Sequence, residues 1–125
     1  MKLAADGINW EPDPLILDER YVAVHVKGKG VVVFTVCSHA GVINVLTDAR
    51  KVLGDVPLYA VMGGFHLSGS GVEAIIPDTI RDLGKFALKR IIPCHCTGWR
   101  ALHALAQVYK EDVLMPAAVG RQFVF

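Results

Sequence analysis

The chain has 125 residues, a formal net charge of +1 and 53% apolar residues. This length fits a single domain with a sizeable core, and the scattered charge argues against nucleic acid or a membrane surface as partner. The apolar fraction exceeds the usual ~45–50% of a soluble domain, so either the core is large or apolar surface remains for a partner. Three cysteines cannot all pair within one chain, and no export signal or membrane-length apolar run is evident. We therefore expect a cytoplasmic protein whose cysteines are reduced thiols or metal ligands.

The first third of the chain predicts an irregular lead-in and then a β-hairpin. Residues 1–19 have no hydrophobic period. Residues 21–27 alternate between apolar and polar side chains, and residues 31–36 form an almost continuous apolar run. Lys27-Gly28-Lys29-Gly30 lies between them as a turn, which predicts a hairpin. The second strand is apolar on both faces, as is typical of a central strand.

Helical and strand patterns alternate through the rest of the chain. We expect helices over 41–53, from Pro77 to about Gly84 and over 99–109, and strands over 57–62, 89–93, 113–115 and 119–125. The inward residues expected are Val42, Val45, Leu46, Ala49, Val52 and Leu53 in the first helix, Ile76, Ile80 and Leu83 in the second, and Leu102, Leu105, Ala106 and Tyr109 in the third. The order β-β-α-β-α-β-α-β predicts an α/β domain with right-handed crossovers and mostly parallel strands.

Three of these strands each run into a loop that carries a histidine: His39, His66 and His95. The carboxyl ends of such strands lie at one edge of the sheet, so the three side chains can converge. Imidazole is a common metal ligand, and three protein ligands plus water form the layout of a catalytic zinc site. The sequence therefore predicts a metal site. The alternative is that each histidine caps a helix or bonds a loop carbonyl.

Other chemically active side chains carry weaker signals. His25 and His103 are expected on the surface, and Cys37 and Cys94 as small buried residues. In an extended segment neighbouring side chains alternate sides, so His95 is not expected to share a metal with the adjacent cysteines. The glycine pair at 63–64 is expected to turn the backbone sharply ahead of His66.

Three segments carry a family resemblance: FTVCSHAGVIN (34–44), MGGFHL (62–67) and PCHCTGW (93–99). From about Asp13 onward the chain resembles the metallo-β-lactamase superfamily, and within it the metal-dependent hydrolases labelled dihydropterin ribofuranosylaminobenzene phosphate synthase-like. The resemblance implies a zinc or manganese site in a cleft between two sheets, hydrolysing esters or phosphoesters with a metal-bound hydroxide. It implies His39 and His95 as ligands and His66 as a third ligand or substrate contact. Ser38, Gly64 and Thr97 lie in the same motifs and are the candidate substrate contacts.

The departure from the family is equally informative. The H-x-H-x-D-H motif of the superfamily occurs nowhere in this sequence. The chain, as a single domain over 1–125, resembles only the C-terminal half of the αβ/βα sandwich, and a truncated chain is also compatible. No acidic residue adjoins the three histidines; Glu73 and Asp78 are the nearest after His66, and they are expected to complement a helix dipole.

Two functions follow from this half-fold. The chain is either a hydrolase completed by a second copy or a complementing N-terminal half, or a non-catalytic module that binds a metal or anion and self-associates. With helices on one face of the sheet, the opposite apolar face predicts a homodimer.

Overall fold

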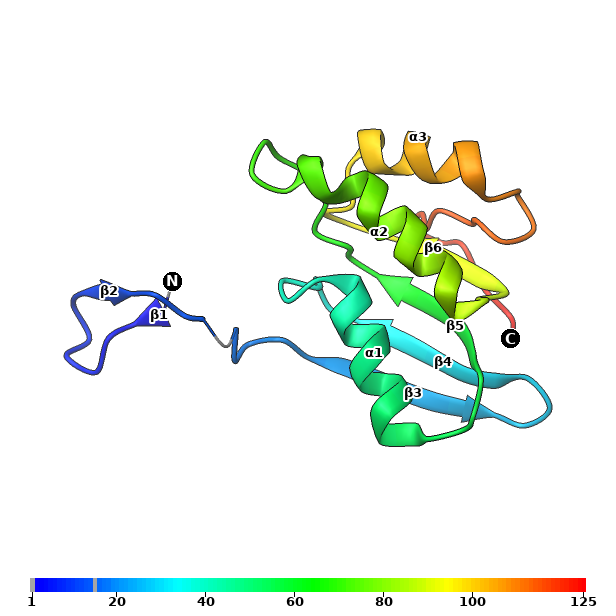
Figure 1. Ribbon diagram of the computed structural model, residues 1–125, viewed down its shortest axis with the longest axis horizontal. Helices are drawn as coiled ribbons and strands as arrows, with labels where there is room; N and C mark the ends of the chain where they lie inside the picture. Colours follow the sequence, from blue (N-terminus) through cyan, green and yellow to red (C-terminus); the bar gives the residue numbers. More distant parts are fainter. Residues whose placement is uncertain (1, 15) are drawn as a thin grey trace.

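The computed structural model describes residues 2–14 and 16–125 and has one four-stranded sheet as its main body (Figure 1). The strands of this sheet are β3 (Tyr21–Val26), β4 (Gly30–Thr35), β5 (Leu58–Gly63) and β6 (Arg90–Pro93), in the order β3-β4-β5-β6. The helices are α1 (Val42–Leu53), α2 (Ile76–Leu83) and α3 (Trp99–Val108), with the 3₁₀ turns η1 (Glu73–Ile75) and η2 (Gly84–Phe86) around α2. β3 and β4 pair as an antiparallel hairpin, and β4, β5 and β6 are parallel. The predicted mixed α/β half-sandwich is confirmed.

The helices cover one face of the sheet and bury the main core against it (Figure 1). The α2 residues expected inward are buried, as are the first four of the α1 stripe. Two expectations were wrong. Val52 is 69% exposed although its neighbour Leu53 packs against the core, and Ala106 is exposed whereas Ala101 is fully buried. In α3 the predicted Leu105 is fully buried and the predicted Tyr109 packs partly buried against the core, whereas Ala101 is buried where Ala106 was expected.

The opposite face of the sheet is contacted by the end of the chain, which leaves the edge of β6 after the N–H of Ala117 has donated to the carbonyl of Pro93 at 3.0 Å. The ring of Phe125 packs edge-on against Phe34 of β4, with centroids 6.2 Å apart. The strand predicted over 119–125 is therefore wrong: this segment has no ladder, and Val119 and Val124 are almost fully exposed. The strand predicted over 113–115 is reduced to one parallel bridge between Leu114 and Ile91, at the edge of β6.

The lead-in is more ordered than the sequence pattern indicated. β1 (Lys2–Leu3) and β2 (Trp10–Glu11) form a small antiparallel hairpin that projects from the body (Figure 1). A turn at Asp6-Gly7 makes it possible, because Asp6 Oδ1 accepts the backbone N–H groups of Ile8 and Asn9. Asp-Gly is a hairpin signal, and it was missed because the flanking strands are only two residues long. Met1 and Leu15, also in the predicted irregular stretch, lie outside the described residues.

The helices of the described part of the chain include none that is both long enough and apolar enough to cross a membrane.

Candidate metal centre

The loops that follow β4, β5 and β6 share an unusual backbone feature. Each contains one non-glycine residue in the left-handed region: Ser38 (φ 54°), His66 (φ 47°) and Cys96 (φ 53°). Such residues cost of order 1–3 kcal/mol each and persist only where their surroundings hold them. Hydrogen bonds do so here. Ser38 Oγ bonds Thr35 Oγ1 at 2.9 Å within the first loop. The N–H of Gly64 donates to the carbonyl of Val36 at 3.3 Å, and the N–H of Leu67 donates to the carbonyl of Cys96 at 3.0 Å. The three loops are thus locked together at one edge of the sheet.

His39 is oriented by a carboxylate from the lead-in. Its Nδ1 donates to Asp18 Oδ2 at 3.0 Å, and this bond is the main reason that the pKa of Asp18 lies below its ordinary value. The adjacent Glu19 accepts the backbone N–H of Ala40 at 2.9 Å, which fixes the same loop. With Nδ1 engaged, Nε2 of His39 remains as its free donor atom. The expectation that no acidic residue lies beside the histidines was wrong, since Asp18 is 21 positions away in sequence and carries no local signal.

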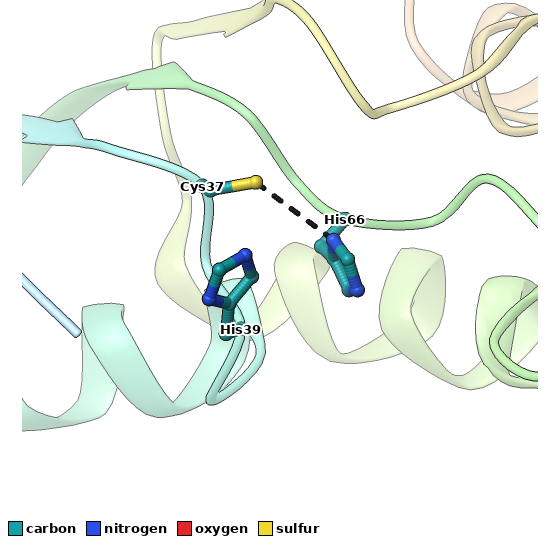
Figure 2. Close-up of side chains that lie close together, drawn as sticks. All are labelled: Cys37, His39 and His66. Carbon is teal, nitrogen blue, oxygen red and sulfur yellow. Dashed lines mark hydrogen bonds between the residues drawn. The ribbon is translucent and has the colours of Figure 1, made fainter. Parts of the chain in front are cut away.

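His66 and His39 face each other beside a cysteine. Figure 2 shows Cys37 and His39 on the loop after β4 and His66 on the loop after β5. The two imidazole rings stand edge to face with centroids 4.8 Å apart, and Cys37 Sγ lies 3.8 Å from His66 Nδ1. Nitrogen or sulfur ligand atoms of these three residues all lie within 4.8 Å of one another.

His95 belongs to a second group, which shares Cys37 with the first but contains neither His39 nor His66. Ligand atoms of Cys37, His95 and Cys96 also lie within 4.8 Å of one another, and the two sulfur atoms are 3.0 Å apart. The expectation that His95 and Cys96 point apart was wrong, because the left-handed backbone of Cys96 breaks the alternation of an extended segment. Cys37 is half-buried and belongs to both groups, so it is more than the small core residue that its place at a strand end suggested.

In the absence of a metal ion, the surroundings of Cys37 favour the protonated form of its thiol. Burial first, and then the hydrogen bond shared with Cys96, raise the pKa of the Cys37 thiol to about 11. The pKa of Cys94 is also raised, chiefly by burial, but its Sγ points to the carbonyl of Ile92 at 3.6 Å. Cys94 belongs to neither ligand group.

Two glycines make room for this arrangement. A Cβ on Gly64 would meet Cys96 Sγ at 2.7 Å and His95 Nε2 at 2.8 Å, so only glycine leaves those donor atoms their present positions. A Cβ on Gly63 would lie 2.0 Å from the carbonyl oxygen of Thr35, where β5 approaches β4. The role of these glycines is thus a close approach of atoms, and the sharp turn expected from the sequence stays a prediction.

Ser38 and Thr97, the other predicted substrate contacts, are buried and form hydrogen bonds within the loop region. The Ser38 side chain is 1% exposed and bonds Thr35, although Ser38 also lines the cavity next to His39. Thr97 is fully buried, and its Oγ1 accepts the N–H of Phe65 at 3.3 Å. Their assignment as substrate contacts stays a prediction.

The remaining sequence expectations concern residues outside the cluster. His25 and His103 are exposed and belong to neither ligand group. Glu73 pairs with Arg100 at 2.8 Å, and Asp78, in the first turn of α2, pairs with Arg81.

The donor set fits a metal ion. Two ligands of one tetrahedral zinc are separated by about 3.3–3.8 Å, given Zn–N near 2.0 Å and Zn–S near 2.3 Å. Cys37 Sγ and His66 Nδ1, 3.8 Å apart, are within about 0.3 Å of the spacing of about 3.5 Å expected for a sulfur and a nitrogen ligand. The carboxylate behind His39 resembles the outer-shell partner that zinc-bound histidines commonly have.

A cavity adjoins the two facing histidines. It measures about 240 Å³ and lies between the N-terminal turn of α1, the loop after β5 and the region of η1 and α2. A second hollow of about 600 Å³ is also lined by His39 and His66, together with Lys2, Asp13, Ile16 and Asp18. Both imidazoles are therefore accessible to a small molecule.

Sequence comparison gives relatives that are longer than this chain. Over 95 residues, 76% of this chain, it is 38% identical to 7,8-dihydropterin-6-methyl-4-(beta-D-ribofuranosyl)-aminobenzene-5'-phosphate synthase of Methanocaldococcus jannaschii, of which the match covers 32%. It is 39% identical over 93 residues to the uncharacterized protein MJ0448 of the same organism, covering 74% of this chain and 34% of that protein. The chain thus spans about a third of the length of these relatives. No protein-family profile matches the sequence.

Comparison of structures gives the same relationship. The crystal structure of Tm1679, described as a metal-dependent hydrolase of the beta-lactamase superfamily, aligns with a TM-score of 0.69 and 30% sequence identity. The alignment covers 82% of this chain and 39% of Tm1679. These matches show that the chain is similar, in sequence and in fold, to one part of a metal-dependent hydrolase of the metallo-β-lactamase superfamily.

Proposed function

We propose that this chain is the metal-binding half of a hydrolase that acts on an ester or phosphoester, with His39, His66 and His95 as ligands of zinc or manganese. The observation that carries the proposal is the clustering of these side chains around Cys37 at the ends of three neighbouring strands. The relationship to a metal-dependent hydrolase supports it. A reducing cytoplasmic setting, which the proposal assumes, would keep the three cysteines free.

In this proposal, different residues of the chain bind the metal, orient a ligand and attract the substrate. His39 and His66 would hold the ion next to the cavity, and Asp18 would keep His39 in the tautomer that presents Nε2. A metal in such a site supplies Lewis acidity, which polarises a substrate oxygen and lowers the pKa of water. The N-terminal turn of α1 lines the same cavity, and its dipole would favour an anionic group such as a phosphoester.

The chain would need a partner to complete the site. It spans about a third of its relatives and lacks the H-x-H-x-D-H motif, so ligands and a nucleophile-orienting carboxylate must come from elsewhere. A complementing N-terminal segment would supply that motif, whereas a second copy, which has the same sequence, would have to supply other side chains. We expect little hydrolysis of nitrophenyl phosphoesters by the chain alone, and a marked increase when a segment bearing that motif is added.

A second candidate function is a non-catalytic metal- or anion-binding module. The incomplete ligand set favours it for the isolated chain. A related possibility follows from the relative named as a synthase of a ribofuranosyl aminobenzene phosphate, namely a part in assembling a phosphorylated product instead of hydrolysing one. Assays with and without the complementing segment distinguish these functions.

Metal analysis tests the proposal directly. The purified chain should bind about one zinc-like ion, with modest affinity because ligands are missing. His95→Ala should remove most of this binding, and His39→Ala should weaken it. His25→Ala and His103→Ala are matched controls and should leave it unchanged, since both histidines lie outside the ligand groups. Absence of binding, or binding indifferent to all three ligand substitutions, would refute the site.

A further inference from the structure

The two cysteines at the centre of the cluster are the feature that the proposed histidine site leaves unused. Cys37 and Cys96 come from different loops, 59 residues apart in sequence, yet their sulfur atoms lie 3.0 Å from each other. His95 offers a nitrogen to the same group, within 4.8 Å of both sulfur atoms.

We propose that Cys37 and Cys96, as thiolates, bind the metal together with His95, and that the ion is consequently a thiophilic one such as Zn²⁺ and not Mn²⁺. This inference rests on the metal-binding part of the proposed function. Thiolate ligands select zinc and copper(I), whereas manganese prefers carboxylates, carbonyls and water. On binding, each thiol releases one proton to solvent and its sulfur forms a bond to the ion.

The surroundings of Cys96 fit a bound thiolate. The backbone N–H of His66 donates to Cys96 Sγ at 3.2 Å, and hydrogen bonds to a charged acceptor are stronger than neutral ones. The absence of a side chain at Gly64 leaves the space in which Cys96 Sγ and His95 Nε2 meet. Two thiolates on one tetrahedral zinc lie about 3.8 Å apart, so the sulfur atoms need to separate by about 0.8 Å from their present contact at 3.0 Å. A small rotation about the Cα–Cβ bonds provides this.

The position of Cys37 links the two ligand groups. Its sulfur contacts both Cys96 Sγ, at 3.0 Å, and His66 Nδ1, at 3.8 Å. An ion bound by Cys37 would therefore lie next to the His39–His66 pair and the cavity. The thiolates thus belong to the proposed site and tune its metal preference.

Cobalt substitution tests this inference spectroscopically. Titration of the purified chain with Co²⁺, under a non-thiol reductant, should give the near-ultraviolet thiolate-to-cobalt charge-transfer band. Cys37→Ser and Cys96→Ser should each abolish or strongly reduce the band and weaken Zn²⁺ binding by at least about 100-fold, more than is usual for loss of an outer-shell partner. Cys94→Ser is the matched control and should keep the band. Zn²⁺ should displace Co²⁺, and Mn²⁺ at equal concentration should not.

A steric pair of variants checks the site without removing a thiol. Gly64→Ala should reduce the charge-transfer band, because the added Cβ collides with both Cys96 and His95. Gly71→Ala should not, since the space around Gly71 is open. Circular dichroism establishes that each variant is folded before its spectrum is interpreted.

The outcomes separate this inference from the function on which it rests. Co²⁺ bound with a ligand-field spectrum but without the charge-transfer band would overturn thiolate ligation and leave the histidine site standing. Equal competition by Mn²⁺ would overturn the proposed metal preference. Failure of the chain to bind either Co²⁺ or Zn²⁺ would overturn the proposed function, and this inference with it.

Discussion

The left-handed residues Ser38, His66 and Cys96 explain how a short stretch of chain can gather so many ligand atoms. A side chain that follows a strand ordinarily continues the alternation of that strand. A left-handed residue interrupts the alternation, so that His95 and Cys96 can serve the same site although they are neighbours. Strain of this kind is commonly found at functional sites, where surrounding contacts maintain it.

Asp18→Asn should weaken metal binding without unfolding the chain. The amide cannot match the charge-assisted bond of Asp18 to His39 Nδ1, and loss of such an outer-shell partner typically costs 10–100-fold in affinity. Zinc titration by calorimetry measures the effect. Asp55→Asn, on an exposed aspartate far from the site, is the control. Equal affinities of the Asp18 variant and the unaltered chain would show that Asp18 does not orient His39.

The contact between Asp18 and His39 also makes the free energy of unfolding depend on pH. Because its bond to His39 lowers the pKa of Asp18, this carboxylate stabilises the fold above its ordinary pKa of 3.8. The stabilisation is lost as the pH falls through the lowered value, and Asp18→Asn should be insensitive to that part of the acid transition.

The elements are held in register by a few specific contacts as well as by the core. The hydroxyl of Tyr21, on β3, donates to Asp48 Oδ2 on α1 at 2.7 Å. It fastens the first helix over the edge strand of the sheet. At Gly63 the absence of a side chain lets the end of β5 lie close to Thr35 of β4, just before the metal-site loops begin.

Tyr21→Phe should lower the free energy of unfolding by about 1 kcal/mol at neutral pH, the usual net value of such a hydrogen bond. Burial and then Asp48 raise the pKa of Tyr21 to about 12. The protonated phenol therefore stabilises the fold fully below pH 10, and this part is lost as the pH rises from 10 through 12. Urea denaturation at several pH values should show the difference between the two proteins shrinking over that range. A constant difference up to pH 12 would contradict the assignment.

Gly63→Ala should destabilise the chain by roughly 2–4 kcal/mol. The new Cβ would overlap the carbonyl of Thr35, and the backbone at φ 146° is unfavourable for alanine. Thermal denaturation followed by circular dichroism measures this loss, and Gly71→Ala is expected to be near neutral. A variant as stable as the original would mean that the β4 and β5 ends can separate without cost.

At the scale of the whole molecule, the face of the sheet opposite the helices is the surface on which association with a partner would depend. The sequence predicted that this face would be bare, but Phe125, at the end of the chain, packs against Phe34 on it. Val22 and Val24 of β3 remain 62% and 44% exposed, and Val36 is 60% exposed. Leu3, Ile8 and Trp10 of the projecting hairpin add further exposed apolar surface. A stable interface needs about 800 Å² from each partner, so these patches would have to act together.

A homodimer therefore stays our prediction for the chain on its own. Sedimentation equilibrium at micromolar concentration should show a species of twice the 13.6 kDa chain mass. The double variant Val22→Lys, Val24→Lys should shift it toward monomer, because burying two charges on that face is costly. Val108→Lys, on an equally exposed valine of α3, should leave the dimer intact. A monomer that binds no hydrophobic dye would refute the exposed-face argument.

Local patterns in the sequence were sufficient for much of the fold. The hairpin, the order of strands and helices, and the placement of three histidines after three strands follow from periods of 2 and 3.6 residues and from turn glycines. These signals are local, so they survive without knowledge of the tertiary contacts. The same topology implied that His39, His66 and His95 lie at one edge of the sheet, because parallel strands end together.

The details of the site depend on contacts between residues distant in sequence. Asp18 reaches His39 from 21 positions away, and Cys37 meets Cys96 across 59 positions. Neither pair has a periodic signal, and the left-handed backbone of Cys96 is fixed by hydrogen bonds from the neighbouring loop. The C-terminal segment is a similar case: its apolar residues predicted a strand over 119–125, but these residues form no strand, and Phe125 instead packs against Phe34 of β4, 91 positions earlier in the sequence.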